Sequence, residues 1–220
     1  MISPPPATEL RITPNDAGVE IESPASGLRF LHSFLTGPIA RRAAQPTQLL
    51  LKACNNKQRN LLGVLDLTAG WGVDAFVLAR HGHPVTLLEH DSRIHAVVAH
   101  SLACLARDPR ESAVAAAMTL HHAEALAYLR AMSPQHPFDC IYLDPMFPAH
   151  KSGARPAKEM QLLQAIAGND NIEACLELAC RLARRRVVVK RSARAPALGG
   201  VAPDLVQRAR SIRFDIYLTA

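Results

Sequence analysis

The segment DLTAGWGVD, residues Asp66–Asp74, decides the fold, and it follows an almost wholly apolar run at Leu61–Leu67. A short apolar run of this kind predicts a strand that is buried on both faces of a parallel sheet. Gly70 and Gly72 predict a tight turn, because glycine adopts backbone conformations that other residues avoid. The next residues, Val73–His81, predict a helix. A strand, a glycine turn and a helix in this order indicate the start of an α/β sheet.

The alternation of strands and helices continues beyond this unit. Further strands are expected at Val85–Glu89, Met118–His121, Cys140–Leu143 and Arg186–Lys190, and helices at Ser92–Arg107, Glu124–Ala131 and Ile172–Ala183. Ser92 is a plausible N-cap. Leu205–Arg208 and Arg213–Leu218 are separated by only a short turn, so they predict an antiparallel hairpin. The pattern therefore predicts a Rossmann-like, mostly parallel sheet that ends in an antiparallel hairpin, unlike the six parallel strands of the dinucleotide fold.

Residues 1–60 differ from the rest and predict a small N-terminal β-rich cap on a main domain of residues 61–220. Two alternating segments, residues 10–12 and 19–21, flank the turn residues Pro14–Gly18 and predict a hairpin. Leu28–Leu35 is expected to form another strand or a turn of helix, and Thr47–Asn55 a short helix.

Composition limits the classes of function that fit. The chain has 220 residues and a formal net charge of +6, which favours a polyanionic partner such as nucleic acid. The five cysteines are scattered without a C-x-x-C pair, so we expect reduced thiols, no metal site and a cytoplasmic protein. No apolar run is long enough to cross a membrane, and the N-terminus does not resemble a signal peptide.

The first loop predicts a nucleoside cofactor of unusual charge. It lacks the G-x-G-x-x-G pattern of a pyrophosphate cradle, and it has Asp66 and Asp74 at its two ends. Carboxylates are unsuited to phosphate but suit the ammonium and sulfonium of S-adenosylmethionine (AdoMet). A plain turn with glycines for packing is the alternative. The cofactor-binding residues expected in this loop are Asp66, Thr68, Gly70, Gly72, Val73 and Asp74.

The ends of the second and third strands carry further acids. Glu89 lies about 20 residues past the glycines, where a carboxylate can accept hydrogen bonds from both ribose hydroxyls. Glu124 could accept a hydrogen bond from the adenine amine, or it could simply favour the helix dipole at the first turn.

The most specific feature follows the fourth strand, where Asp144, Pro145 and Phe147 belong to the segment DPMFP. This segment resembles the Asp/Asn-Pro-Pro-Tyr/Phe motif of amine-directed base methyltransferases. An exocyclic amine is a poor nucleophile, and the Asp144 carboxylate and the Pro145 carbonyl could accept its two hydrogens. Phe147 could stack on the flipped base. A proline-rich turn with Phe147 in the core is the alternative.

Basic residues are expected to frame the mouth of this site and to contact a phosphate backbone. They are Arg41, Arg42, Lys151, Arg155, Lys158, Lys190 and Arg191. Ordinary solvated surface charge is the alternative for each of them.

Several segments together resemble the ribosomal RNA small subunit methyltransferase J family of class I AdoMet-dependent methyltransferases. They are residues 66–79, Tyr142–Pro148, Lys158–Met160, Val187–Arg191 and Arg213–Tyr217. The resemblance implies N2-methylation of one guanosine in 16S ribosomal RNA, with naked RNA or the small ribosomal subunit as partner. It also implies AdoMet contacts at Val73–Asp74, Glu89–His90, Glu124–Ala125 and Asp144.

Other functions remain open from the residues alone. An amine methyltransferase could act on adenine N6 or a protein glutamine, and Asp144 suits each of these acceptors. A catalytically inactive RNA-binding protein would bind RNA but not AdoMet. An NAD-dependent oxidoreductase fits less well, because the first loop lacks the dinucleotide pattern.

Overall fold

The structure of the chain is a computed structural model, which describes residues 10–24, 27–45, 49–55, 63–133, 135, 138–145 and 171–219. The central sheet has the order β6-β5-β4-β7-β8-β10-β9. Its strands are β4 (Val64–Asp66), β5 (Val85–Glu89), β6 (Met118–His122), β7 (Cys140–Leu143), β8 (Arg186–Ser192), β9 (Leu205–Arg208) and β10 (Ile212–Leu218).

The pairing of these strands confirms the predicted sheet. Strands β6, β5, β4, β7 and β8 are parallel neighbours. Strand β10 runs antiparallel between β8 and β9. The result is a Rossmann-like sheet with a C-terminal antiparallel hairpin, as the short turn after Arg208 predicts.

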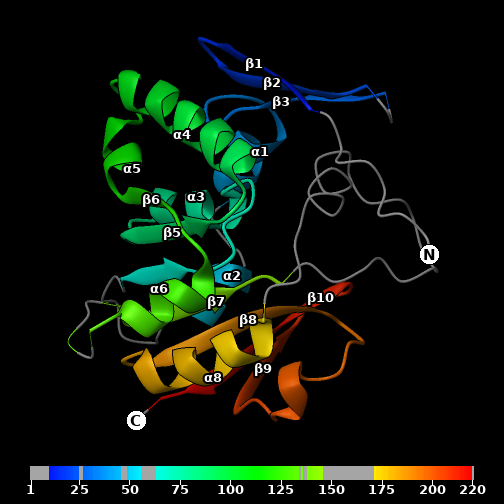
Figure 1. The fold of residues 1–220 in the computed structure, drawn as a ribbon, viewed down its shortest axis with the longest axis vertical. Helices are drawn as coiled ribbons and strands as arrows, with labels where there is room; N and C mark the ends of the chain where they lie inside the picture. Colours follow the sequence, from blue (N-terminus) through cyan, green and yellow to red (C-terminus); the bar gives the residue numbers. More distant parts are fainter. Residues whose placement is uncertain are drawn as a thin grey trace.

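Helices cover both faces of the sheet (Figure 1). One face packs against α3 (Val73–Arg80) and α4 (Ser92–Arg107), and the other packs against α6 (Ala125–Ala131) and α8 (Ile172–Leu182). The alternation of side chains along β7 shows why: Cys140 and Tyr142 join the first core, while Ile141 and Leu143 join the second.

The N-terminal cap is a three-stranded antiparallel sheet of β1 (Arg11–Asn15), β2 (Gly18–Ser23) and β3 (Leu28–His32). The predicted hairpin is confirmed, and the open choice at Leu28–Leu35 resolves as a strand. The cap lies over α4 at the top of Figure 1. It continues into α1 (Gly37–Ala43) and α2 (Leu49–Cys54), and α2 contacts α3 and the strands β8, β9 and β10.

A few local predictions differ from the structure. The N-cap of α4 is Asp91 rather than Ser92, because the Asp91 carboxylate accepts from the backbone N–H groups of Arg93 and Ile94. The sequence pattern also failed to indicate α5 (Ser112–Ala116) and the 3-10 turn at Leu198–Gly200. Both are too short for a clear apolar period.

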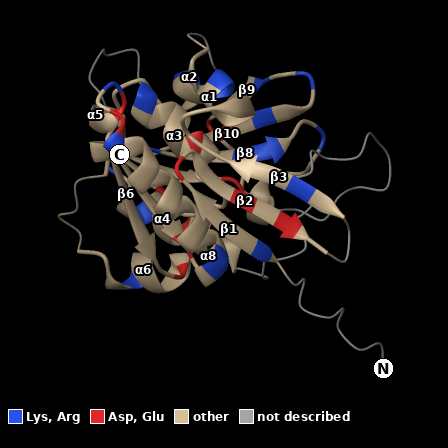
Figure 2. Ribbon diagram, turned by 90° about the horizontal axis from the view of Figure 1, so that it is seen from above, with Lys and Arg blue, Asp and Glu red and all other residues tan. Residues whose placement is uncertain are grey.

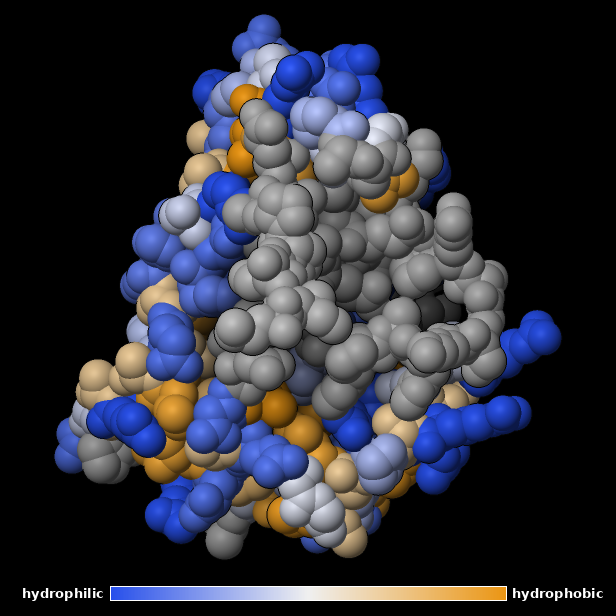
Figure 3. All heavy atoms as spheres, turned by 45° about the vertical axis from the view of Figure 1, so that its right-hand side comes forward, coloured by the Kyte–Doolittle hydropathy of each residue, from blue (hydrophilic) through white to orange (hydrophobic). Residues whose placement is uncertain are grey.

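The three-stranded sheet and the segment after it share one apolar core with the helices of the central sheet. Ile21 and Phe34 are buried in the same cluster as α3 and α4, and the ring centroids of Phe34 and Phe76 lie 4.7 Å apart. On the outside, the space-filling view in Figure 3 shows hydrophilic side chains over much of the described surface, with apolar ones concentrated toward its lower part.

A buried histidine joins the cap to the first loop of the sheet. One ring nitrogen of His32 lies 2.8 Å from the backbone oxygen of Trp71, and the other lies 2.8 Å from Ser101 Oγ. Burial lowers the pKa of His32 to about 4, because there is no water to solvate the charged imidazolium. Trp71 itself is 5% exposed and packs edge-on against Phe30.

This histidine should make stability depend on pH. The pKa of the folded state, about 4, lies below the unfolded value of about 6.5, so the stabilisation is complete above pH 6.5 and falls as the pH drops toward 4. Urea unfolding should show a loss of about 2 kcal/mol between pH 7 and pH 5 that the variant His32→Gln lacks. Equal losses in both proteins would contradict this role.

Candidate active site

The candidate site lies at the carboxyl ends of the parallel strands, where the loops after β4, β5, β6 and β7 meet. Backbone hydrogen bonds connect them: Ala69 N–H donates to the Leu88 carbonyl at 3.0 Å, and Ala123 N–H donates to the Glu89 carbonyl at 3.1 Å. The Asp144 N–H donates to Thr68 Oγ1 at 2.6 Å. The predicted strand-end residues that the structure describes are therefore brought to one edge of the sheet, as expected for a parallel α/β fold.

The first loop makes the tight turn that its glycines predict. Gly70 and Gly72 have φ angles of 50° and 68°, which lie in the left-handed region. A Cβ atom on Gly72 would also come within 3.2 Å of Phe34 Cζ. Position 72 therefore needs glycine for its backbone conformation and for close packing against the cap.

Asp66 shapes this loop from within. It is 1% exposed, and its Oδ1 accepts from the Thr68 N–H at 3.0 Å. Burial, with further contributions from Asp74 and Asp144, raises the pKa of Asp66 to about 8. We therefore expect a largely protonated Asp66 at neutral pH, which reduces the negative charge that the sequence led us to expect at this position.

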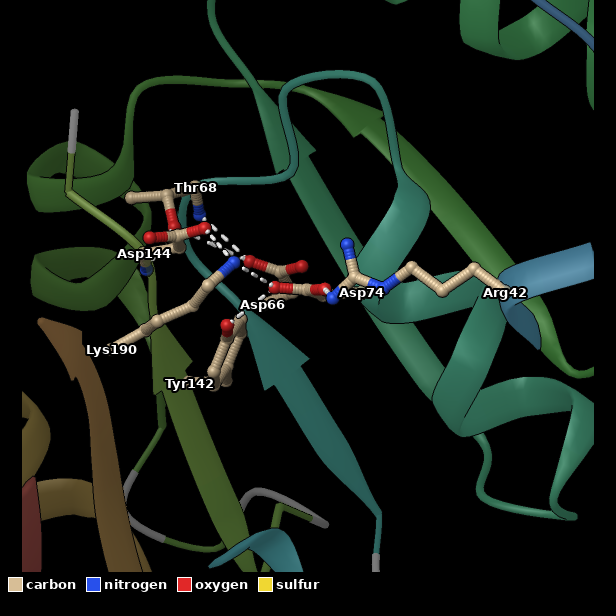
Figure 4. Close-up of polar contacts among 7 residues, drawn as sticks. All are labelled: Arg42, Asp66, Thr68, Asp74, Tyr142, Asp144 and Lys190. Atoms are coloured by element: carbon tan, nitrogen blue, oxygen red, sulfur yellow. Dashed lines mark hydrogen bonds and ion pairs between the residues drawn. The ribbon is translucent and has the colours of Figure 1, made fainter. Parts of the chain in front are cut away.

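The centre of the site is a cluster of charged side chains from four elements (Figure 4). Lys190 Nζ of β8 lies 2.8 Å from Asp74 Oδ2 and 2.6 Å from Asp144 Oδ2. The hydroxyl of Tyr142 also donates to Asp74 Oδ2, at 2.6 Å, and Arg42 from α1 reaches Asp74 Oδ1 from the other side at 2.5 Å. Asp74 is thus fully engaged by donors of the protein.

The pKa shifts follow from this arrangement. Burial by itself would raise the pKa of Asp74, but Lys190 and Arg42 lower it to about 2. Burial raises the pKa of Asp144, and Lys190 opposes that rise. Burial would lower the pKa of Lys190, but the two carboxylates raise it well above its usual value. Lys190 therefore stays protonated between two carboxylates.

Glu89 lies beside the first loop at the end of β5. It is 5% exposed, its Oε1 accepts from the Asp91 N–H at 2.7 Å, and the Gly70 backbone also hydrogen-bonds to it. Burial raises the pKa of its carboxyl. The next residue, His90, is exposed, and its Nδ1 lies 3.4 Å from Glu89 Oε1.

Glu124 has a structural role in this conformation. It is the N-cap of α6, and its two carboxylate oxygens accept from the N–H groups of Leu126 and Ala127 at 2.8 and 2.6 Å. Of the two roles that the sequence left open, the helix terminus is the one that these contacts favour. Ala125 is buried in the core below it.

Two of the expected phosphate contacts need correction. Lys190 points into the charged cluster, and its side chain is only 14% exposed. Arg191 is 5% exposed and donates to the Pro196 carbonyl at 2.6 Å, so it does not face solvent. Arg42 pairs with Asp74, but its side chain is 42% exposed, so its expected contact with phosphate stays a prediction. Sequence alone could not separate these residues from surface cations, since the direction of a side chain depends on the neighbouring strands.

The remaining site predictions have different outcomes. Arg41 is exposed. Phe147, Lys151, Arg155 and Lys158 lie outside the described residues. Tyr142 was missed, although the alternation along β7 could have placed it on the face toward α3.

The residues at this edge fit AdoMet in charge. Even with Asp66 largely protonated, the carboxyl groups of Asp74, Glu89 and Asp144 outnumber the two cations Lys190 and Arg42, which suits a ligand with an ammonium and a sulfonium. The loop at Gly70 brings its backbone next to the Glu89 carboxylate. No group of three or more potential metal ligands occurs within the described ranges. Of the helices in those ranges, none combines the length and apolar character needed to span a bilayer.

The fold and this site together define a class I AdoMet-dependent methyltransferase. Residues 7–219 match the model of a family described as "Putative SAM-dependent methyltransferase". A SAM-dependent methyltransferase of known structure from Neisseria gonorrhoeae aligns with a TM-score of 0.75 and 29% identity, over 99% of this chain and 86% of the other.

Two relatives of known name identify a family within this class. Ribosomal RNA small subunit methyltransferase J of Nitrosococcus oceani is 40% identical over 91% of this chain and 81% of its own length. The protein of the same name from Pectobacterium atrosepticum is 38% identical over 90% and 80%. This chain belongs to the ribosomal RNA small subunit methyltransferase J family.

The position of Glu89 predicts a measurable contribution to cofactor binding. The variant Glu89→Gln should raise the AdoMet dissociation constant about tenfold or more in isothermal titration, because hydrogen bonds to a charged group contribute about 1.5–3 kcal/mol. The matched variant Glu177→Gln, at an exposed ion pair on α8, should bind AdoMet as the wild type does. An unchanged dissociation constant in Glu89→Gln would remove this residue from the cofactor site.

Proposed function

We propose that this protein transfers a methyl group from AdoMet to the exocyclic N2 amine of a guanosine in 16S ribosomal RNA. The observation that carries the proposal is the position of Asp144, held by Lys190 and Thr68 at the tip of the central strand β7. The relatives named above support ribosomal RNA as the substrate class. Such a substrate also supports a cytoplasmic location.

The chemistry of an exocyclic amine suits the groups at this tip. The amine nitrogen shares its lone pair with the ring, so it is a poor nucleophile until hydrogen-bond acceptors draw its hydrogens out of the ring plane. Lys190 pairs with Oδ2 of Asp144. The other oxygen, Oδ1, and the Pro145 carbonyl are therefore the proposed acceptors for the two N–H groups of the amine. Phe147 is the proposed stacking partner of the base.

AdoMet, when bound, supplies a methyl group activated by its sulfonium. Glu89 would bind the ribose, and the loop from Thr68 to Asp74 would hold the amino-acid part. Formation of the new N–C bond would be matched by loss of the methyl–sulfur bond of the donor, which would leave a neutral thioether, and by loss of one N–H proton from the amine. Asp144 already accepts a hydrogen bond from that group and can take the proton or pass it to water, so a strong base is not needed.

Lys190 acts through Asp144 as a positioning residue. Its ammonium lies between two carboxylates, and both contacts are short enough to fix the Asp144 side chain in one orientation. The Asp144 N–H bond to Thr68 Oγ1 holds the backbone at the same point. The acceptor oxygen is therefore positioned before substrate binds, which lowers the cost of orientation in the reaction.

The names of the relatives favour a base of ribosomal RNA over a protein acceptor, and guanosine N2 rests on the sequence resemblance. Adenine N6 and a protein glutamine amide offer the same kind of nitrogen to Asp144. The relatives act, by name, on ribosomal RNA of the small subunit, and that supports a nucleic-acid base over a protein amide. A catalytically inactive RNA-binding protein would not need the acidic groups at the first loop.

The direct test uses a bacterial strain that lacks its own family member. Wild-type protein should restore one N2-methylguanosine in 16S ribosomal RNA, as measured by nucleoside mass spectrometry. Asp144→Ala should lower methyl transfer by about 100-fold or more while AdoMet binding and thermal unfolding stay near the wild type. Wild-type turnover in this variant would refute the role of Asp144, and restoration of a different modified nucleoside would refute the substrate.

Removal of Lys190 should affect the rate more than binding. In Lys190→Met the pKa values of Asp144 and Asp74 rise because the cation between them is removed, so the acid limb of the kcat–pH profile should move to higher pH. We expect kcat to fall about 100-fold with little change in KM for RNA. Lys190→Arg should recover part of kcat and shift the acid limb back. An unshifted profile in Lys190→Met would show that Lys190 is only structural.

A further inference from the structure

The loop after β8, residues 193–196, is fixed by arginine side chains beneath it. Arg213 Nη1 donates to the carbonyls of Ala195 and Ala193 at 2.6 and 3.2 Å. Arg191 donates to the Pro196 carbonyl at 2.6 and 3.2 Å, and Arg208 Nη1 lies 3.5 Å from the Ala193 carbonyl. Charged donors therefore satisfy three positions of the loop backbone, which restricts its conformation.

Arg213 is itself held in place by a buried acid. Its Nε and Nη2 donate to the two carboxylate oxygens of Asp215 at 2.6 and 2.9 Å, and Asp215 is fully buried. This bidentate pair fixes the plane of the guanidinium, so that the remaining Nη1 points to the loop. The loop is therefore a preformed element of the fold.

The outer side of this loop carries cations with little acid nearby. Arg194, Arg208 and Arg210 are exposed, and we refer to these three residues as the arginine edge. The Ala193 N–H donates to the Ser211 carbonyl at 3.0 Å, so the backbone next to Arg194 adjoins the backbone next to Arg210. Between residues 184 and 214 the sequence has nine Lys or Arg residues and a single acid, Asp204.

That acid lies at the far end of the hairpin. Asp204 precedes β9 and accepts from the Leu218 N–H at 2.7 Å, at the end of β10. The arginine edge lies at the opposite end, where β9 ends and β10 begins. Its positive charge is thus not offset by Asp204.

The arginine edge and Asp144 both lie at the end of the sheet where the parallel strands have their carboxyl ends. Strands β7 and β8 are parallel with Leu143 opposite Val189, so Asp144 and the loop after β8 both follow the carboxyl ends of neighbouring strands. Figure 2 shows basic positions on β8 and around β9.

We propose that Arg194, Arg208 and Arg210 bind the phosphodiester backbone of the RNA next to the target nucleotide. The proposal rests on the proposed function. Guanidinium groups bind phosphate oxygens well, and such contacts fix the register of a nucleic acid without reading its sequence. The sequence predicted that Lys190 and Arg191 contact phosphate, but their side chains point away from solvent. The arginine edge is the proposed phosphate-binding surface in their place.

The test compares two double variants that each remove two positive charges. Arg194→Ala/Arg210→Ala alters the arginine edge and leaves Arg208, which contacts the loop. Arg130→Ala/Arg184→Ala is the matched control: both residues are exposed, and they lie at the last turn of α6 and before β8, toward the opposite edge of the sheet. Binding to 16S ribosomal RNA is measured by gel shift at several salt concentrations, and methyl transfer is measured with labelled AdoMet.

The edge variant should bind RNA at least tenfold more weakly, and the slope of log affinity against log salt should fall by about 2, because two phosphates are no longer neutralised by an arginine. Its KM for RNA should rise, while kcat at saturating RNA and the AdoMet dissociation constant stay as in the wild type. Arg194→Glu/Arg210→Glu should weaken binding further. The control variant should match the wild type in each measurement.

Three results have distinct meanings. If the edge variant binds RNA as the control does, the arginine edge is not an RNA contact and the proposal is overturned. If it fails to methylate assembled small subunits but binds and methylates naked RNA normally, the edge contacts a ribosomal protein, which also overturns the proposal. If wild-type protein binds RNA through the arginine edge but transfers no methyl group to it, the edge is an RNA-binding surface and the proposed function is wrong.

Discussion

The contact of Lys190 with Asp74 and Asp144 is the interaction on which the arrangement of the site depends. Two carboxylates so close together in a poorly solvated place would repel each other, and burial would push both toward the neutral form. The ammonium between them, at 2.8 and 2.6 Å, helps to lower the pKa of Asp74 to about 2 and opposes the rise in the pKa of Asp144. Removing Lys190 would leave two buried carboxylates without their shared cation, which is destabilising, whereas removing Asp144 leaves Lys190 paired with Asp74. The network thus ties the helix α3, the strand β8 and the tip of β7 into one unit.

The cap extends this network toward the N-terminus. Arg42 of α1 pairs with Asp74, while His32 of β3 holds the Trp71 carbonyl within the glycine loop. One contact is ionic and the other is a buried neutral hydrogen bond, but both act on the same loop–helix segment. The cap therefore has a defined role: it supports the first loop from the side opposite to Lys190. Its apolar residues join the same core as α3 and α4.

The buried and the exposed basic residues have different roles. Lys190, Arg191 and Arg213 lie inside the fold, where each contacts a carboxylate or a backbone carbonyl. Arg42 is half-exposed and pairs with Asp74. Arg194 and Arg210 remain at the surface. The basic residues behind the net charge of +6 are thus not spread evenly over the surface. Some of them hold the site and the loop after β8 in place, and others face solvent at the same edge of the sheet.

The sequence by itself determined the parallel sheet, its terminal hairpin, the glycine turn and the position of Asp144 after the central strand. These features depend on local patterns: apolar runs, glycines at a turn, and an acid next to a proline. It could not determine which cations are buried, that Glu124 caps α6, or that Tyr142 joins the site. Those outcomes depend on contacts between residues far apart in the chain, such as Arg42 with Asp74 and Lys190 with Asp144, and only the packed strands and helices decide whether a polar side chain meets a partner or water.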